Sequence, residues 1–258
     1  MPELLTGHHR TMHIPPPFDL RTGLVGYWTM DEVSGNRADS SGVGNTLTDN
    51  NTVTQGTAKR GTSSAQFASA TDESLSHADS ASLSLNGNSW TWWMWFYADT
   101  LVDTSVSTDS PRLMGKWADS THKEIDVRID NPGGSAAALK FAVYDGTSTQ
   151  VGTVTALPTL AVTTWYFAVG WVDLSAGRIF VQVNNGPVAS AALSGIPGDS
   201  TSALYLGWYE AGTAIDHSAH WNGRIDEVGI SKRVYSAAER SRLYAGAAGV
   251  TWPLPVGQ

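Results

Sequence analysis

The chain contains no cysteine among its 258 residues. This absence excludes a disulfide scaffold, a thiolate zinc site, an iron–sulfur centre and a cysteine nucleophile, and it leaves the redox compartment open. Basic residues are also scarce, because 16 Lys and Arg face 24 Asp and Glu and give a formal net charge of −8. Neutralising phosphates requires a surplus of basic side chains on one face, so the composition argues against a nucleic-acid-binding protein.

Long hydrophobic runs are missing as well. No stretch approaches the roughly 18 apolar residues of a membrane span, and residues 1–20 contain no apolar run of the roughly 7–15 residues of a secretory signal. We therefore expect no membrane contact and no export signal. Tryptophan is abundant instead, with 11 residues in a chain that is only 16% charged. Stability is expected to come mainly from apolar burial and backbone pairing.

The body of the chain alternates short apolar or aromatic segments with turn-forming residues. Strands are expected at 24–28, 65–67, 90–98, 125–129, 139–144, 165–172, 178–183, 204–208 and 224–230. Asn185-Gly186 predicts a type I′ hairpin turn, because both central positions of that turn need a positive φ. Many short strands without intervening helices indicate antiparallel pairing. The sequence therefore predicts an all-β fold, a two-sheet antiparallel sandwich.

One segment, residues 236–246, is expected to form a short C-terminal helix. Ser236 and Glu239 have the spacing of a capping box, and Gly246 lies where a left-handed residue ends a helix. Leu243 and Tyr244 are then available to pack on a sheet.

The two ends of the chain differ from the body. Residues 1–22 include Pro15, Pro16 and Pro17, which favour an extended polyproline II path. We expect this arm to contact another chain or a second copy through the three prolines and Phe18, and the chain to be a homo-oligomer; a disordered leader is the alternative. The tail, residues 248–258, is expected to dock in the same way, which leaves residues 23–247 as the single domain.

Several motifs make a family resemblance visible. Leu24-Val-Gly-Tyr-Trp-Thr-Met-Asp-Glu32 followed by Asp39-Ser-Ser-Gly42, and later Trp221-Asn-Gly-Arg-Ile-Asp-Glu-Val-Gly-Ile230, resemble the laminin-G-like members of the concanavalin A-like superfamily. The resemblance covers roughly residues 23–247 and implies a jelly-roll sandwich. It leaves function open, because lectins, carbohydrate-binding modules, adhesion domains, glycoside hydrolases and viral surface proteins share this fold.

The resemblance also implies a structural calcium ion. In the family, the Asp of the Ile-Asp-Glu-Val motif, here Asp226, often binds Ca²⁺ together with backbone carbonyls and an acid near the first strand, here Asp31. Asp39 and Asn45 could supply further oxygens, which suits a cation that takes six to eight hard ligands. The alternative is that Asp226 accepts hydrogen bonds from loop or strand amides without a metal.

Exposed aromatic side chains are the candidates for carbohydrate binding. Sugar rings stack on flat aromatic surfaces, and Trp117, Trp208 and Tyr209 lie where strand ends or loops are expected. In the segment 90–97, alternate residues point to opposite faces. One set must be core, and the other is expected to form an apolar patch that contacts a ligand or another chain; the sequence does not decide which.

Catalytic and metal-binding alternatives find little support. Glu124-Ile-Asp126 is the nearest approach to a glycosidase carboxylate pair, but its alternating context predicts an ordinary half-exposed strand. His217 and His220 could share a metal, but their surroundings favour a solvated loop.

These observations predict a non-enzymatic binding or structural module. The sharper hypothesis is a bacteriophage virion surface protein, either a head decoration protein or a tail fibre component, that contacts other virion chains and binds host glycans. The alternative is a carbohydrate-binding module of a secreted polysaccharide-degrading system; a glycoside hydrolase is the third candidate.

Overall fold

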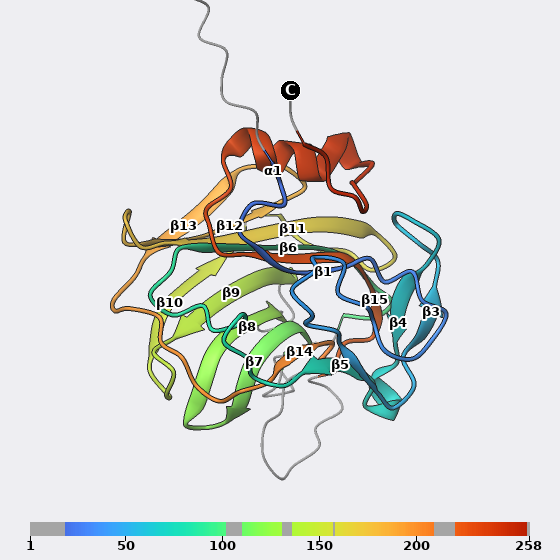
Figure 1. Cartoon of the computed structure of the whole chain (residues 1–258), viewed down its shortest axis with the longest axis horizontal. Helices are drawn as coiled ribbons and strands as arrows, with labels where there is room; N and C mark the ends of the chain where they lie inside the picture. The colour runs from blue at the N-terminus through green and yellow to red at the C-terminus, as the bar shows by residue number, and fades with distance from the viewer. Residues whose placement is uncertain (1–18, 102–109, 131–135, 157, 209–219, 257–258) are drawn as a thin grey trace, which may run out of the picture.

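The computed structural model describes residues 19–101, 110–130, 136–156, 158–208 and 220–256, and two antiparallel sheets pack against each other in it (Figure 1). The eight-stranded sheet runs β13 (Val188–Ala192), β12 (Arg178–Val183), β11 (Trp165–Asp173), β6 (Trp90–Ala98), β15 (Gly223–Ser231), β4 (Ser64–Phe67) and β3 (Thr54–Gly56), with β1 (Leu24–Trp28) also paired to β15. The seven-stranded sheet runs β10 (Gln150–Thr155), β9 (Ala138–Tyr144), β8 (His122–Asp130), β7 (Arg112–Asp119), β14 (Leu204–Leu206), β5 (Ser74–His77) and β2 (Thr48–Asn50). The predicted jelly-roll sandwich is confirmed.

All of the predicted strand segments contain a strand, and the described part of the chain has six further strands without a counterpart in the prediction: β2, β3, β5, β7, β10 and β13. Most of these are short or rich in polar residues, so the alternation of apolar side chains is too weak to mark them. The predicted strand 204–208 ends at Leu206, because Gly207 has a φ of 82° and turns the chain away.

Strand β6 supplies side chains to two separate cores. Trp90, Trp92, Met94 and Phe96 lie between the two sheets. Trp93 and Trp95 point to the other side of the eight-stranded sheet, where they pack with Tyr235 and with Leu243 of α1 (Ala237–Tyr244). Figure 1 shows α1 lying across that outer side. The expected exposed apolar patch on this strand is therefore wrong, because the chain covers it with its own C-terminal segment.

The helix and the hairpin turn follow the predicted chemistry with a shift of one residue each. Ser236 and Glu239 form the capping box, but the left-handed residue that ends α1 is Ala245, with a φ of 46°. In the hairpin between β12 and β13, Asn184 and Asn185 carry the positive φ values of 51° and 54°. Both central positions are thus asparagines, which tolerate this conformation, and Gly186 follows the turn.

The described parts of the two chain ends belong to the sandwich. Leu20 and Leu254 are buried in the core beneath α1, and Asp19 forms a β-bridge with Val256. The tail through Val256 therefore packs on its own domain, and its docking on another chain stays a prediction. Pro15, Pro16, Pro17 and Phe18 lie outside the described residues.

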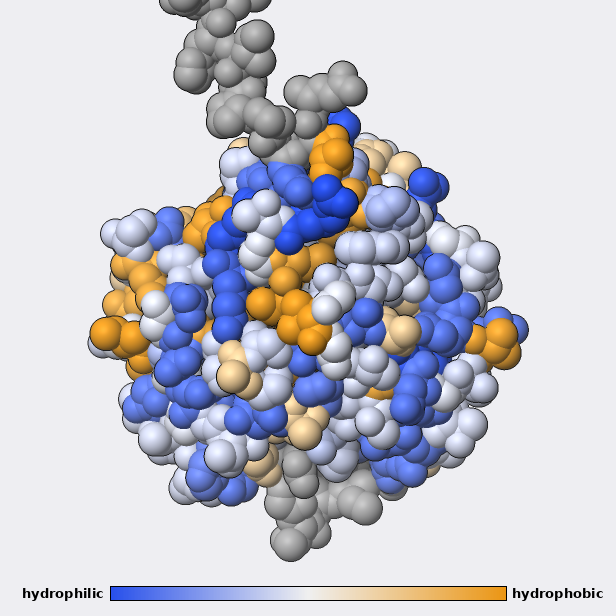
Figure 2. All heavy atoms as spheres, in the orientation of Figure 1, coloured by the Kyte–Doolittle hydropathy of each residue, from blue (hydrophilic) through white to orange (hydrophobic). Residues whose placement is uncertain are grey.

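The surface seen in Figure 2 is largely polar, with apolar side chains gathered in small separate groups. No helix of the described residues has the length and apolarity that crossing a bilayer requires.

Candidate functional site

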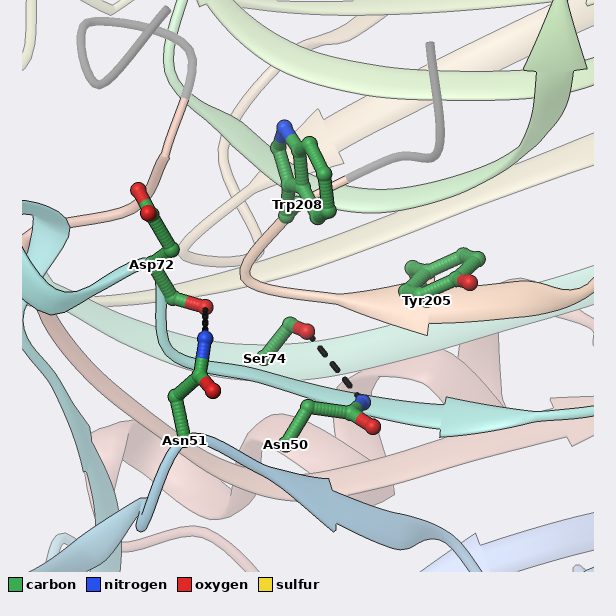
Figure 3. A pocket seen from close by; sticks show the side chains of 6 residues that line it. All are labelled: Asn50, Asn51, Asp72, Ser74, Tyr205 and Trp208. Carbon is green, nitrogen blue, oxygen red and sulfur yellow. Dashed lines mark hydrogen bonds between the residues drawn. The ribbon is translucent and has the colours of Figure 1, made fainter. Parts of the chain in front are cut away.

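A pocket of about 270 Å³ opens at the edge of the seven-stranded sheet where β2, β5 and β14 lie side by side. Figure 3 shows the side chains that line it: Asn50, Asn51, Asp72, Ser74, Tyr205 and Trp208. The register pairs Asn50 with Ser74. The neighbouring residues Leu75, Leu204 and Leu206 point into the core. Because side chains alternate along a strand, Ser74 and Tyr205 face outward and form the floor of the pocket.

The wall formed by the segment after β2 has unusual backbone geometry. Asn51 and Thr52 have φ values of 65° and 72°. The left-handed region is unfavourable for a β-branched residue such as Thr52. The carboxamide of Asn51 donates to the backbone oxygen of Asp72 at 3.0 Å, and the amide of Val53 donates to Asp49 at 2.8 Å. These bonds hold a strained segment in place, as is common at binding sites.

Trp208 is held in place by its aromatic neighbours. The His220 ring stacks on it with centroids 4.4 Å apart and planes 21° apart, and Tyr205 meets it edge-on at 6.1 Å. His220 itself is 1% exposed, and its Nε2 lies 3.4 Å from Asp72 Oδ1. The expectation that His220 belongs to a solvated loop is therefore wrong, because its ring packs beneath Trp208. His217 lies outside the described residues.

The polar side chains of the pocket are joined by hydrogen bonds. Asn50 donates from its amide nitrogen to the hydroxyls of Ser74 and Ser76, at 3.3 and 3.0 Å. Because both amide hydrogens of Asn50 are directed to these hydroxyls, its side-chain oxygen is the atom that can accept a hydrogen bond in the pocket. The pocket thus combines one indole and one phenol with fixed carboxamide, carboxylate and hydroxyl groups.

The predicted aromatic ligand residues do not come together. Trp208 lines the pocket, whereas Trp117 lies on β7 against Tyr144, with the Lys123 ammonium 4.1 Å from its ring centroid. Tyr209 lies outside the described residues. Sequence reasoning missed Asn50, Asn51 and Asp72, because isolated polar residues in a turn-rich stretch give no signal until the strands bring them to one edge.

The two acids predicted to bind calcium approach each other at the loop 57–63. Asp226 is 0% exposed, and its Oδ2 accepts from the amides of Lys59 and Arg60 at 2.8 and 2.9 Å. Asp31 Oδ1 accepts from the amides of Thr62 and Ser63. Asp226 therefore accepts hydrogen bonds from loop amides, as the alternative given in the sequence analysis expects.

A third acid, Glu227, follows Asp226 on β15 and was not predicted. It has a φ of 51° at an irregular step of β15, and the Tyr27 hydroxyl donates to it. Burial raises the pKa of Asp226 to about 8, with a further rise from the Glu227 and Asp31 carboxylates. Burial likewise raises the pKa of Glu227 to about 7. Asp226 Oδ1 and Glu227 Oε1 are buried without a hydrogen-bond partner, and carboxylate oxygens are ligands that Ca²⁺ takes. The ligand atoms of Asp31, Asp226 and Glu227 are not, however, a set that lies within 4.8 Å of one another.

The other proposed oxygen donors are already engaged. Asp39 accepts hydrogen bonds from the amides of Tyr27, Ser41, Gly44 and Asn45, and the Asn45 carboxamide donates to the backbone oxygen of Val25. Both side chains therefore organise the loop after β1.

A second acidic group lies on the seven-stranded sheet. Among the described residues, one set of three acids has ligand atoms within 4.8 Å of one another: Asp79, Glu124 and Asp199. The Lys116 ammonium lies 3.0 Å from Asp79 and 2.9 Å from Glu124. The Lys116 ammonium thus already pairs with two of these three carboxylates, and we assign no metal to the group.

The carboxylate pair on β8 is buried and paired with cations. Glu124 is 3% exposed and Asp126 is 0% exposed, so the expected half-exposed strand is wrong. Asp126 pairs with Arg112 at 3.4 Å and with Arg128. Carboxylates held in this way are poor candidates for acid–base work on a sugar, which needs two free carboxyls facing each other across the glycosidic bond.

Solved structures that resemble this chain include binding domains of toxins. The chain is similar to the binding domain of Paraclostridial Mosquitocidal Protein 1 (TM-score 0.68, 14% identity, 88% of this chain and 52% of that one). It is also similar to domain 4 of AbnA, a GH43 extracellular arabinanase from Geobacillus stearothermophilus, in complex with arabinotriose (TM-score 0.59, 15% identity, 88% and 98%). A third is the binding domain of botulinum neurotoxin DC in complex with SialylT (TM-score 0.61, 8% identity, 88% and 52%).

This chain therefore spans about half the length of the two toxin domains and nearly all of the arabinanase domain. At identities this low, the structural similarity shows a shared fold only. The function of this chain must therefore be argued from its own site. No curated protein sequence matches the chain. Residues 69–239 match the family model described as the concanavalin A-like lectin/glucanases superfamily. That match and the two-sheet jelly roll together show that the chain belongs to the concanavalin A-like lectin/glucanase superfamily.

Proposed function

We propose that this chain is a non-enzymatic glycan-binding module and that the sugar binds in the pocket formed by Trp208, Tyr205 and the polar residues around them. The observation that carries the proposal is the combination of a fixed indole with hydrogen-bonding groups in one hollow of about 270 Å³. Ligand sites typically have this composition, with aromatic surface for contact area and a few polar groups for orientation.

Trp208 would supply the stacking surface for the apolar face of a sugar ring. Its own ring is stacked on His220 at 4.4 Å, which fixes its orientation before a ligand arrives. A side chain that is already immobilised loses little conformational entropy on binding, so more of the contact energy remains as affinity.

The polar groups would read the sugar hydroxyls. The Asn50 side-chain oxygen and the Asp72 carboxylate are acceptors, and Ser74 and Tyr205 offer hydroxyls that both donate and accept. Because Asn50, Ser74 and Tyr205 lie on three adjacent strands, the sheet itself holds their spacing. Sites on rigid elements keep more precise geometry than sites on loops alone.

Replacing Trp208 tests the proposal. A glycan array with the whole chain would identify a ligand, and isothermal titration would then compare Trp208→Ala with Trp117→Ala. We expect Trp208→Ala to weaken binding by at least about 30-fold, the effect of losing an aromatic hot spot of ~2 kcal/mol. Trp117→Ala is the matched control and should bind like the wild type. The reverse pattern, or a Trp208→Ala variant with unchanged affinity, would refute the assignment.

Calcium is proposed as a structural ion at Asp31, Asp226 and Glu227. The buried oxygens without partners on Asp226 and Glu227 support it. A bound ion would offset two of the three carboxylate charges and tie the segment after β1 and the loop 57–63 to β15. At 100 times its Kd, Ca²⁺ should stabilise the fold by about 2.7 kcal/mol and raise the Tm by roughly 5–10 °C. Equal melting temperatures in EGTA and in Ca²⁺ would argue that the amides alone satisfy these acids.

The surface of a bacteriophage particle is the proposed setting, with the chain acting as a head decoration or tail fibre component. The acidic, cysteine-free composition supports it. Mass spectrometry of purified particles should find this chain in them. Its absence from particles and presence in culture medium would favour the alternative, a module of a secreted polysaccharide-degrading system. The similarity to an arabinanase domain over 98% of that domain supports that alternative.

Self-association through residues 1–18 belongs to the same proposal. The mass of the whole chain in solution, measured by light scattering, should be a multiple of 27.5 kDa. Removal of residues 1–18 should reduce it to a monomer. A monomeric whole chain would remove this part of the proposal and leave the glycan site untouched.

A further inference from the structure

The cover on the outer side of the eight-stranded sheet stops before the end of β6. Trp95 and Phe167 are buried there, and both pack against Tyr244 of α1. The next outward-facing residues on the same two strands are Tyr97 and Trp165, which are only half-buried and pair with each other across β6 and β11. This end of the sheet therefore presents aromatic surface to solvent.

The half-buried residues continue as a row over four neighbouring strands. The register places them side by side on β11, β6, β15 and β4, in the order Trp165, Tyr97, Arg224 and Gln66. The Tyr97 and Trp165 ring centroids lie 5.5 Å apart with planes 57° apart, and the Arg224 guanidinium lies 4.3 Å from the Tyr97 centroid. We call these four residues the aromatic row.

The aromatic row combines ring surface with hydrogen-bond donors. A guanidinium carries five N–H hydrogens, and Arg224 directs its Nε hydrogen to Gln66 at 2.9 Å and one terminal nitrogen toward Asp99 at 3.6 Å. Its other hydrogens and the Tyr97 hydroxyl can donate to a ligand. A polyproline II segment suits such a surface, because its rings pack on aromatic side chains and its backbone carbonyls have no internal donors.

The chain itself contains a segment of this kind, Pro15-Pro16-Pro17-Phe18. We propose that this segment docks on the aromatic row of a second copy of the chain, and that two copies exchange their segments in a two-fold dimer. The inference rests on the self-association given under the proposed function and adds the surface that accepts the segment. In a two-fold dimer the same contact is made twice.

The aromatic row of the same chain is too distant for this segment. The backbone oxygen of Asp19 accepts from the Arg233 guanidinium at 3.0 Å, and the backbone oxygen of Arg233 accepts from the Thr91 hydroxyl at 2.7 Å. Asp19 therefore lies near the Thr91 end of β6, and the strand runs about 20 Å from Thr91 to Tyr97. Residues 15–18 span at most about 14 Å when fully extended. A second copy is not subject to this limit.

A similar aromatic pair on the other sheet is covered by cations. The Trp117 and Tyr144 rings lie 5.6 Å apart with planes 59° apart. The Lys123 ammonium lies 4.1 Å from the Trp117 centroid and 5.6 Å from that of Tyr144, and the Arg112 guanidinium lies 5.2 Å from that of Trp117. Trp117 is therefore the matched control for Trp165, because its ring has a nearly identical aromatic neighbour but a different environment.

Sedimentation equilibrium of the whole chain measures the dimer Kd. Loss of one aromatic hot spot weakens a contact by about 30-fold, so Trp165→Ala, which affects both contacts of the dimer, should raise the Kd by up to about 1,000-fold. Replacing the three prolines 15–17 with alanine should raise it as well, because the pyrrolidine rings are lost. Trp117→Ala should leave the Kd unchanged. Circular dichroism checks that each variant is folded.

Paired cysteines locate the segment even if Trp165→Ala fails to fold, because the chain has no cysteine of its own. Thr164 is exposed beside Trp165, and Thr121 is exposed in the turn between β7 and β8 on the other sheet. We expect Pro16→Cys/Thr164→Cys to form a disulfide-linked dimer under mild oxidation, seen on a non-reducing gel. Pro16→Cys alone and Pro16→Cys/Thr121→Cys are the controls and should form much less.

The possible failures are distinguishable. A whole chain that stays monomeric would refute the proposed self-association and this inference with it. A dimer that is lost on removal of residues 1–18 but keeps its Kd in Trp165→Ala would leave the self-association standing and overturn the aromatic row as the acceptor. Equal disulfide yields with Thr164→Cys and Thr121→Cys would overturn it too. None of these results bears on the glycan pocket.

Discussion

Lys116 offers the sharpest test of how this fold is stabilised. Its side chain is 1% exposed, and its ammonium lies 3.0 Å from Asp79, 2.9 Å from Glu124 and 3.2 Å from the backbone oxygen of Leu83. The ammonium donates hydrogen bonds to Asp79 and to the Leu83 oxygen and forms an ion pair with Glu124. Glu124 is buried too, and its second oxygen accepts from the amide and the hydroxyl of Ser200.

The variant Lys116→Met keeps an unbranched side chain for packing and removes the charge. It leaves the Glu124 carboxylate buried without its cation. Removing one partner of a buried ion pair typically costs about 3–5 kcal/mol. In a domain of this size the Tm should fall by roughly 6–20 °C.

The stability lost in Lys116→Met should increase as the pH rises. Burial already raises the pKa of Glu124, and Lys116 opposes that rise. Without Lys116 the folded-state pKa of Glu124 moves further above its unfolded value, so the folded state binds a proton more tightly than the unfolded state does. Stability then falls as pH rises through the interval between the two values. The variant should therefore be closer to the wild type at pH 4.5 than at pH 8.

Urea unfolding followed by circular dichroism at both pH values measures this. The double variant Lys116→Met/Glu124→Gln keeps an acceptor for Ser200 and removes the orphaned charge, so it should recover a large part of the loss. Three results would refute the reasoning. The first is a loss of unfolding free energy below about 1 kcal/mol in Lys116→Met at pH 8, and the second is a loss that does not change with pH. The third is a double variant whose loss equals the sum of the losses of the two single variants.

Three further predictions concern other parts of the molecule. In metal-free buffer the folded pKa values of Asp226 and Glu227, about 8 and about 7, lie above their ordinary values of about 3.9 and 4.3. Their contribution to stability is then full at low pH and is lost as pH rises from about 4 to 8; urea unfolding with EGTA should show this loss, and Asp226→Asn should reduce it. A loss that is equally steep in Asp226→Asn would contradict the assignment. Leu254→Ala should cost about 2–5 kcal/mol in the same assay, because Leu254 is 2% exposed in the core beneath α1; a loss under 1 kcal/mol would mean that the tail does not pack there. Thr52→Gly should stabilise the fold by about 1 kcal/mol, because Thr52 has a φ of 72°; a lower Tm would show that its side chain makes contacts that outweigh the strain.

Local chemistry explains what the sequence predicted well. The segment 90–98 is an aromatic and β-branched run, and β6 occupies those residues. Ser236 and Glu239 form the predicted capping box, because a cap needs only four neighbouring residues. The small shifts at Ala245 and Asn184 arise because several adjacent residues there tolerate a positive φ, and sequence alone does not rank them.

The errors share a different cause. Glu124 and Asp126 look exposed in a charged, alternating segment, yet Lys116, Arg112 and Arg128 on β7 and β8 neutralise them. The alternation of charged and apolar residues around them does indicate a strand. Whether the charged face of that strand is buried depends on which residues cover it. The same holds for Trp93 and Trp95, which are covered by a helix that follows them by more than a hundred residues.

The sequence by itself determined the class of fold, the short C-terminal helix and the family, because each depends on a local pattern or a continuous motif. Only the tertiary structure decided which face of β6 is covered, that Glu227 joins the two acids, and that Asn50, Asp72 and Trp208 meet at one pocket. Asn50 lies on β2, Asp72 precedes β5 and Trp208 follows β14, and these three strands are separate along the chain and adjacent in the sheet. Pairing between such strands is set by the packing of the whole sandwich, and no window of the sequence contains it.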